Sequence, residues 1–243
     1  MLLMEDVKGV EMLTRRDWNG EKQNIIDNLR SFVEIYQKRP FENSGGVGAS
    51  AAFHLYYFLK ELNPDAVIES GIWRGFSTWV IGQSVPKAKI ICLDPVIALH
   101  EHIAPESYNP FYRHPGAAYS HQDFSSTRFG PFDPEKVCVI FDDHNNKFER
   151  LLLARSRGIR HVIFDDNMPY PYTHHTLEMM VKQGGEATLS QIVERYDLFP
   201  ALWDMVKEGT FCPGLNLPEL EDLKEQFPWA ETYSWMTYVR LKG

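Results

Sequence analysis

The stretch that decides the fold is AVIESGIWRGFSTW, residues 66–79. It begins with a short apolar run that is typical of a buried strand and that ends in an acid, Glu69. Gly71 and Gly75 come next as turn residues, and a helix is expected to begin at Ser77. Such a strand–turn–helix unit presents backbone N–H groups at a helix N-terminus, where a carboxylate or a phosphate can bind.

A second apolar run, residues 88–93, ends directly before Asp94. An acid at the tip of the second strand of such a unit usually accepts hydrogen bonds from a ribose diol, so the two segments predict a pocket for a nucleoside with a charged end. The spacing Gly71-x-x-x-Gly75 differs from the G-x-G-x-x-G of dinucleotide-binding loops, and no Gly-Lys-Ser/Thr of a phosphate loop follows. An ordinary turn without a ligand is the alternative.

Strands and helices alternate along most of the chain. The apolar runs predict strands at 66–69, 89–93, 117–120, 137–141 and 161–164, and the first of them leads to a helix at 77–84. This alternation predicts an α/β fold: a Rossmann-like, doubly wound and mainly parallel sheet with helices on both faces. We expect further helix over 186–209 and an antiparallel C-terminal strand within 231–242.

The N-terminal part is expected to be a helical extension. Helical spacing of apolar residues predicts helices over 22–38 and 50–62, whereas residues 1–20 are interpreted as a mobile or loosely packed arm. The glycine-rich segment 40–48 is either a lid that closes over a site or an ordinary solvent loop. We therefore predict a single domain over residues 1–243, with the extension or lid at 1–62 and a Rossmann-like core at 63–243.

Two neighbouring strands are predicted to end alike. The residues that follow them are Asp142, Asp143 and His144 in one case and Asp165, Asp166 and Asn167 in the other. Because the carboxyl ends of parallel strands share one edge of a sheet, these acids should lie close together, where they repel unless a cation or a shared proton compensates. Hard oxygen ligands of this kind suit Mg²⁺, Mn²⁺ or Ca²⁺. Capping of the segments that follow is the alternative role for these aspartates.

The motif E-x-G-x-x-x-G-x-S, which runs from Glu69 to Ser77, resembles the first motif of class I S-adenosylmethionine (SAM) methyltransferases. The resemblance implies that Gly71 and Gly75 make room for the methionine part of SAM, that Ser77 contacts its carboxylate and that Asp94 holds the ribose. The cofactor-binding residues predicted in this way are Glu69, Gly71, Trp73, Gly75, Ser77, Thr78, Asp94, Gln122, Asp123 and Asp142. For two of them a plain role stays open, since Trp73 could simply pack and Asp123 could cap a helix.

The acidic strand ends resemble those of metal-dependent catechol O-methyltransferases, and macrolide-sugar O-methyltransferases show a similar arrangement. The resemblance implies that Asp143, Asp166 and Asn167 bind Mg²⁺ and that the metal holds two substrate oxygens. Since the acids are doubled in this chain, the choice within each pair stays open by one residue. The predicted catalytic residues are Asp143 and, as candidate bases, Lys147 and His144; a histidine of the pair His174-His175 is a further candidate base.

Composition excludes some functions. The 243-residue chain has a net charge of −8 and a pI of about 5.6, which argues against a nucleic-acid backbone as its main partner. Its three cysteines form no C-x-x-C pair or disulfide framework, so we expect a reducing compartment, the cytoplasm. The first residues lack the pattern of a signal peptide, and no apolar run reaches membrane-spanning length.

Together these features predict a SAM-dependent, divalent-metal-assisted O-methyltransferase that acts on a hydroxyl of a sugar or another polyhydroxylated small molecule or glycan. Its cofactors would be SAM and Mg²⁺, or Mn²⁺ or Ca²⁺ in place of Mg²⁺, and a homo-oligomer is compatible with the sequence. Two alternatives stay open: a metal-dependent hydroxylase or hydrolase on the same fold, and a non-catalytic SAM-fold binding protein.

Overall fold

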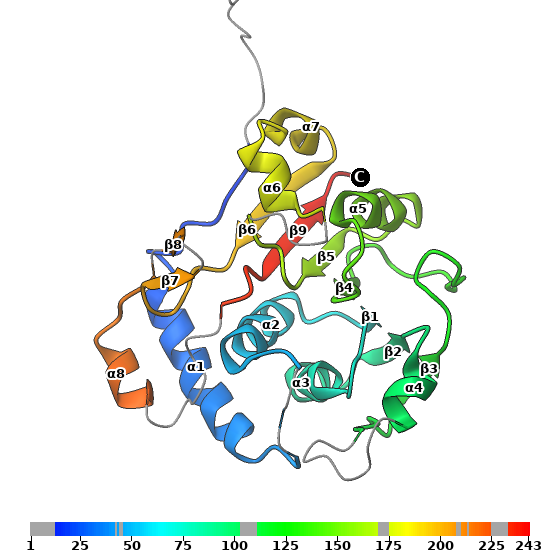
Figure 1. Cartoon of the computed structure of the whole chain (residues 1–243), viewed down its shortest axis with the longest axis horizontal. Coiled ribbons are helices and arrows are strands. Elements are labelled where there is room, and N and C mark those ends of the chain that lie inside the picture. The colour runs from blue at the N-terminus through cyan, green and yellow to red at the C-terminus, as the bar shows by residue number, and fades with distance from the viewer. Residues whose placement is uncertain are drawn as a thin grey trace, which may run out of the picture.

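The computed structural model describes residues 13–41, 43, 46–102, 111–169, 175–207, 210–212, 214–224 and 233–243. A seven-stranded sheet with the order β3-β2-β1-β4-β5-β9-β6 runs through its centre (Figure 1). Its strands are β1 (Ala66–Ser70), β2 (Lys89–Leu93), β3 (Ala117–Ser120), β4 (Val137–Phe141), β5 (His161–Phe164), β6 (Val193–Leu198) and β9 (Thr237–Leu241). The first five strands are parallel, and β9 is antiparallel to both of its neighbours. The predicted Rossmann-like, mainly parallel sheet with an antiparallel C-terminal strand is therefore confirmed.

Helices cover both faces of the sheet (Figure 1). One face carries α1 (Lys22–Gln37), α2 (Ala49–Leu62) and α3 (Phe76–Ser84), and the other carries α5 (Lys147–Ser156), α6 (Leu177–Lys182) and α7 (Glu186–Ser190). Successive residues of a strand point to opposite faces, so Val67 of β1 belongs to the first core and Ile68 to the second. Because α1 and α2 share the first core with the strands, the N-terminal helices form a layer of the fold.

Smaller elements complete the chain. They are α4 (Ile97–His102) after β2, the hairpin of β7 (Met205–Lys207) and β8 (Thr210–Cys212), and α8 (Glu219–Lys224), which contacts α1. Cys92 and Cys138 are buried free thiols in β2 and β4, where they pack as small core residues. Within the described ranges, none of the helices has both the length and the apolar character needed to cross a bilayer.

The predicted helix over 186–209 is wrong beyond its first turn. The chain forms the short helix α7 and then the strand β6, which pairs with β9. A register shift between Val193 and Arg195 interrupts the alternation of this strand, so that Val193 and Tyr196 are both buried three residues apart. With Leu189 and Ile192 before them, these residues reproduce the spacing of a helix. A bulged strand therefore produced the misleading pattern.

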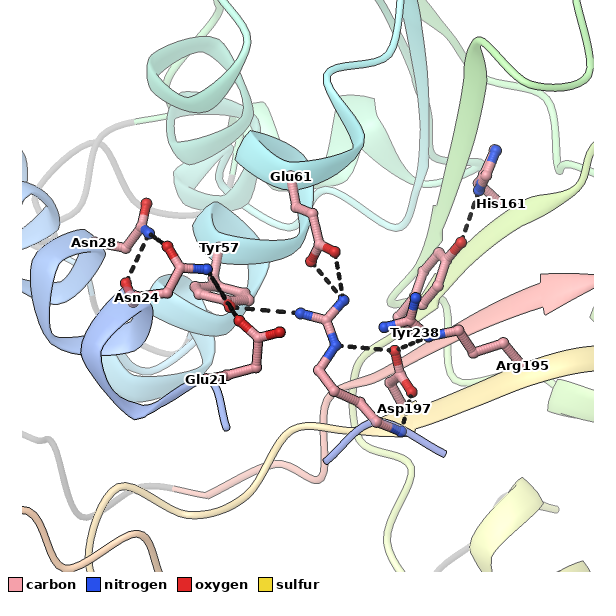
Figure 2. A network of polar contacts seen from close by, with 10 residues as sticks. Glu21, Asn24, Asn28, Tyr57, Glu61, His161, Arg195, Asp197 and Tyr238 are labelled. Atoms are coloured by element: carbon pink, nitrogen blue, oxygen red, sulfur yellow. Dashed lines mark hydrogen bonds and ion pairs between the residues drawn. The ribbon is translucent and has the colours of Figure 1, made fainter. Parts of the chain in front are cut away.

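The expectation of a loosely packed arm over 1–20 is wrong for the part that is described, and residues 1–12 lie outside the described residues. Thr14 forms a parallel bridge with Arg195 beside β6, and its carbonyl accepts a hydrogen bond from Tyr196. The guanidinium of Arg16 is ion-paired with Asp197 and Glu61. Figure 2 shows Glu61, Tyr57 and Asp197 gathered around that guanidinium. This segment therefore covers the edge of the sheet and ties it to α2.

Candidate active site

Four strand ends lie along one edge of the sheet, as predicted. The register pairs Ser70 at the end of β1 with Leu93 of β2 and with Phe141 of β4, and Phe141 with Phe164 of β5. The residues that follow these ends line one pocket of about 750 Å³. In open α/β sheets this edge is where ligands bind, so the pocket is the candidate active site.

The glycine turn after β1 is required by chain packing. Gly71 has a φ of 88°, and a Cβ atom built on it would lie 2.4 Å from the carbonyl oxygen of Asp142. Gly75 has a φ of 87°, and its Cβ would lie 2.3 Å from the carbonyl oxygen of Tyr112. Only glycine tolerates both the left-handed backbone and such close approach. Between them Trp73, with a φ of 43°, is 38% exposed and lines the pocket.

Glu69 lies below this turn and is fully buried. Its Oε2 accepts a hydrogen bond of 2.6 Å from the hydroxyl of Thr78, the second polar residue of α3. Burial raises the pKa of Glu69 to about 7, against an ordinary value of 4.5. Neither Glu69 nor Thr78 is among the residues that line the pocket, and the same holds for Gly75, Ser77 and Gln122. Direct contacts of these residues with a cofactor stay predictions.

Asp94 lines the pocket from the end of β2, next to Pro95 and Val96. Its side chain is held in place, because Oδ2 accepts a hydrogen bond from the backbone N–H of Ile72 at 3.2 Å and Oδ1 from that of Val96 at 2.9 Å. With 4% exposure, this carboxylate is fixed at the pocket wall. Such a fixed acid fits the predicted role of holding a diol.

Arg150 joins two further acids of the pocket wall, and the sequence analysis missed it. It lies near the start of α5, whose N-cap Asn146 accepts hydrogen bonds from two backbone N–H groups. Its guanidinium binds Asp123 with two hydrogen bonds, of 3.1 and 2.6 Å, and is 2.8 Å from Asp143. These hydrogen bonds hold the pKa of Asp123 well below its usual range. Arg150 thus fixes the residues that follow β3 and β4 and shares its one positive charge between two acids. A lone arginine in a helical pattern gives no sequence signal of this role.

Among the described residues, the structure brings together three side chains that are able to ligate a metal, those of Asp142, His144 and Asp166. Each can offer one ligand atom, and these atoms lie within 4.8 Å of one another. His144 and Asp166 have φ values of 55° and 50°, which are uncommon for residues other than glycine and concentrate at functional sites. Burial and the charges of Asp165 and Asp166 hold the pKa of Asp142 well above its usual range. Such crowded carboxylates favour a bound cation or a shared proton.

Two predicted metal ligands, Asn167 and Asp143, do not belong to this group of three side chains. The amide nitrogen of Asn167 donates to Tyr196 and Thr237, and its oxygen accepts from the backbone N–H of Leu177. The amide group of the fully buried Asn167 is thus hydrogen-bonded within the fold, and this residue does not line the pocket. Asp143 lines the pocket but is paired with Arg150 and accepts a hydrogen bond from Ser70. The structure therefore gathers Asp142 and His144 with Asp166, whereas the sequence predicted Asp143 and Asn167 with Asp166 and left the choice between Asp142 and Asp143 open. Which of these residues bind a metal stays a prediction.

The candidate bases also differ in position. Lys147 is 2% exposed, and its Nζ donates a hydrogen bond of 2.6 Å to the carbonyl oxygen of Asp165. It is not among the pocket-lining residues and lies behind the acids, where burial lowers the pKa of its ammonium group in spite of the aspartates nearby. His144 lines the pocket with its side chain 56% exposed. His175 is exposed and does not line the pocket, and His174 lies outside the described residues.

The remaining wall comes from two segments far apart in the sequence. Gly46, Val47 and Gly48 belong to the predicted lid segment, and Tyr233 and Ser234 precede β9. The hydroxyl of Ser234 donates to a carboxylate oxygen of Asp165. The lid segment therefore borders the pocket, while its closing stays a prediction. The part played by Tyr233 and Ser234 was missed, since the aromatic-rich tail predicted only strand structure.

Comparisons with known proteins give distant matches. No protein-family model and no curated protein matches the chain. Among solved structures, an O-methyltransferase from Bacillus cereus in complex with S-adenosylhomocysteine (SAH) is 11% identical, with a TM-score of 0.46 over 90% of this chain and 91% of that one. A CmcI structure with Mg and SAM is 13% identical, with a TM-score of 0.46 over 86% of this chain and 84% of that one. A CmcI structure with SAH is 18% identical over 51% of this chain, which spans only 63% of that protein, with a TM-score of 0.38. The fold assignment rests on this chain's own strand order and register.

Proposed function

We propose that this protein is a SAM-dependent, divalent-metal-assisted O-methyltransferase acting on a hydroxyl of a sugar or another polyhydroxylated small molecule. The observation that carries the proposal is the composition of one pocket. Gly71, Asp94 and Asp123, from the side expected to hold a nucleoside, line the same pocket of about 750 Å³ as Asp142, His144 and Asp166. A methyl donor and a chelated acceptor could meet there.

The residues present fit a nucleoside-containing cofactor. The fixed carboxylate of Asp94 is suited to accept hydrogen bonds from a ribose diol. Asp123, with Arg150 behind it, borders the space expected for a base. Trp73 offers an exposed aromatic face at the pocket wall, which could exclude water from the sulfonium.

The donor set also fits a divalent cation. Asp142 and Asp166 offer hard carboxylate oxygens, and the raised pKa of Asp142 reflects like charges that a cation would compensate. When bound, such a cation would hold two acceptor oxygens and lower the pKa of one hydroxyl, while SAM would supply the methyl group. Lys147 contributes a positive charge from behind, and Ser234 orients Asp165.

His144 is the base that the geometry favours. It lines the pocket beside Asp166, with its Nδ1 3.9 Å from a carboxylate oxygen of that residue. An imidazole can take a hydroxyl proton near neutral pH, and the adjacent carboxylate would stabilise the imidazolium formed. Buried Lys147 is less suited to this role, because its Nζ is bound to a carbonyl oxygen away from the pocket lining.

A second candidate, a metal-dependent hydroxylase or hydrolase, draws support from one feature. The ligand group combines an imidazole with two carboxylates, and imidazole is a common ligand of redox-active and hydrolytic metals. In that case the metal site would function without SAM. Binding of SAM therefore separates the two candidates.

Calorimetry tests the proposal. SAM and SAH are first titrated into the protein in the presence of EDTA. In a separate experiment without EDTA, Mn²⁺ is titrated into the SAH-bound protein. Both titrations use the wild type and Asp166→Asn. We expect both proteins to bind SAH alike and the variant to bind Mn²⁺ at least tenfold more weakly, because a charged ligand is lost. Asp27→Asn, on the exposed surface of α1, is the control. Absence of SAM and SAH binding would contradict the methyltransferase, and unchanged Mn²⁺ affinity in Asp166→Asn would contradict the metal site.

A further inference from the structure

The charges that line the pocket are all of one sign. Six aspartates line it, namely Asp94, Asp123, Asp142, Asp143, Asp165 and Asp166. No Lys or Arg is among the described residues of its lining. In contrast, sites that recognise phosphate, sulfate or carboxylate groups present arginine, lysine or helix N-termini to them. Among the described residues, this lining therefore offers an acceptor no lysine or arginine side chain, and the helix N-terminus after β1 lies on the side expected for the carboxylate of SAM.

The cations near the pocket are already engaged. Arg150 is 4% exposed and divides its guanidinium between Asp123 and Asp143. Lys147 is 2% exposed and bonded to the carbonyl oxygen of Asp165. Neither side chain is placed to meet an acceptor.

Cofactors would not reverse this balance. The charge of a divalent cation would be compensated by the carboxylates of Asp142 and Asp166 that hold it, and the sulfonium of SAM adds one positive charge, whereas Asp94 and Asp165 line the same pocket. With both cofactors bound, the pocket lining is thus left without a net positive charge. An acceptor with a fixed negative charge would enter a partly desolvated site next to unneutralised carboxylates, where repulsion between like charges is strong.

We propose that the acceptor carries no anionic group: the pocket takes neutral or cationic polyhydroxylated molecules, such as a glycoside or an amino sugar, and rejects phosphorylated, sulfated or carboxylated ones. This inference rests on the function proposed above and specifies its substrate class. Acceptors joined to a nucleotide or another phosphate-bearing carrier would be excluded by the same repulsion.

Three probes that share one diol test the charge preference. Catechol, dopamine and 3,4-dihydroxybenzoate present the same vicinal hydroxyls with a neutral, a cationic and an anionic appendage. Each is titrated calorimetrically into the protein loaded with Mn²⁺ and SAH, and its affinity is corrected for that toward free Mn²⁺. We expect dopamine and catechol to bind at least tenfold more tightly than 3,4-dihydroxybenzoate. Equal affinities, or tighter binding of the anionic probe, would overturn the inference while leaving the proposed function intact.

A cation introduced into the wall provides the matched test. Asn145 is exposed and lines the pocket, and its side chain donates only to the carbonyl oxygen of Asp143 among the described contacts. Asn145→Lys should raise the affinity for 3,4-dihydroxybenzoate relative to catechol at least fivefold, whereas Asn145→Gln should leave the ratio unchanged. An unchanged ratio in Asn145→Lys would count against the inference. Failure of the wild type to bind Mn²⁺ or SAH would instead remove the proposed function, and the inference with it.

Discussion

At the scale of single residues, Glu69 is an acid that lies buried beneath the glycine turn, outside the group of Asp142, His144 and Asp166. Its carboxyl group is fully buried, accepts a hydrogen bond from Thr78 and has a pKa raised to about 7 by burial. The protonated form is therefore favoured in the folded chain. Stability from this group is fully present below its unfolded pKa near 4.5 and is lost as the pH rises through about 7.

Glu69→Gln isolates this effect because glutamine is neutral and has nearly the same shape as the protonated acid. Without cofactor or metal, the free energy of unfolding of the variant should gain roughly 3 kcal/mol relative to the wild type between about pH 4.5 and about pH 8. Urea unfolding at several pH values measures it. Glu34→Gln on the exposed face of α1 should show no such trend. A difference between Glu69→Gln and the wild type that does not change with pH would contradict the burial argument.

The sequence predicted the position of some site residues, but it could not decide which of two adjacent acids has a given role. Asp94 and Asp166 could be predicted because each follows a buried strand at a known edge. Whether Asp142 or Asp143 joins the metal-ligating group depends on Arg150, which pairs with Asp143 and comes from a helix. That pairing is a tertiary contact with no trace in the local sequence pattern.

At the scale of elements, the turn between β1 and α3 depends on two separate properties of Gly71. Its φ of 88° is strained for any other residue, and its Cβ would collide with the carbonyl oxygen of Asp142. Gly158 has a φ of 71° but open space around it. Gly130 has open space and no positive φ. A comparison of these three positions therefore distinguishes the effect of backbone strain from that of steric collision.

Alanine substitutions at these positions should rank accordingly. Gly130→Ala should change the free energy of unfolding by less than about 0.5 kcal/mol, and Gly158→Ala should lower it by about 1 kcal/mol through strain alone. Gly71→Ala should lose more than about 3 kcal/mol or fail to fold, because the end of β4 must also move. Chemical denaturation of the three variants measures the order. If Gly71→Ala and Gly158→Ala lowered the free energy of unfolding by similar amounts, the turn would be able to accommodate the added methyl group.

The elements themselves were predictable to different degrees for physical reasons. Strands β1, β4 and β5 are buried on both faces, which requires continuous apolar runs that are easy to recognise. Strand β6 has a mixed burial pattern and a bulge, so its apolar residues imitate helical spacing. Its strand structure follows from pairing with β9, which begins about forty residues later in the chain.

At the scale of the whole molecule, Arg16 links the N-terminal segment to both α2 and the far edge of the sheet (Figure 2). Its side chain is 6% exposed and that of Asp197 is fully buried. Burial raises the pKa of Asp197 in spite of its two arginine partners, Arg16 and Arg195. Removing Arg16 would leave a buried charge with one partner fewer, which is more costly than losing a surface pair.

Arg16→Met should therefore lower the free energy of unfolding by about 3 kcal/mol. Arg30→Met, which removes an exposed pair with Asp27 in α1, should cost less than about 0.5 kcal/mol. Combining Arg16→Met with Asp197→Leu should recover part of the loss, since the fully buried carboxylate would be gone and the side chain of Arg195, which is 34% exposed, reaches water. These values come from urea denaturation. A loss in Arg16→Met no larger than that in Arg30→Met would mean that the N-terminal segment contributes little to the fold.

The net charge of −8 does not reveal where the acids lie, whereas the fold brings six aspartates to one pocket. SAM carries a sulfonium and SAH does not, so their relative affinities measure the potential there. An uncompensated carboxylate about 8 Å away contributes roughly 1 kcal/mol to SAM binding at a dielectric constant intermediate between water and protein.

In EDTA and low salt, SAM should thus bind roughly fivefold or more tightly than SAH. Mg²⁺ should reduce this ratio by adding positive charge beside Asp142 and Asp166, added salt should reduce it by screening, and Asp166→Asn should reduce it before any metal is added. Calorimetric titration of both ligands gives the ratio. A ratio that responds to neither Mg²⁺ nor Asp166→Asn would show that the sulfonium binds too far from the acidic strand ends to sense their charge.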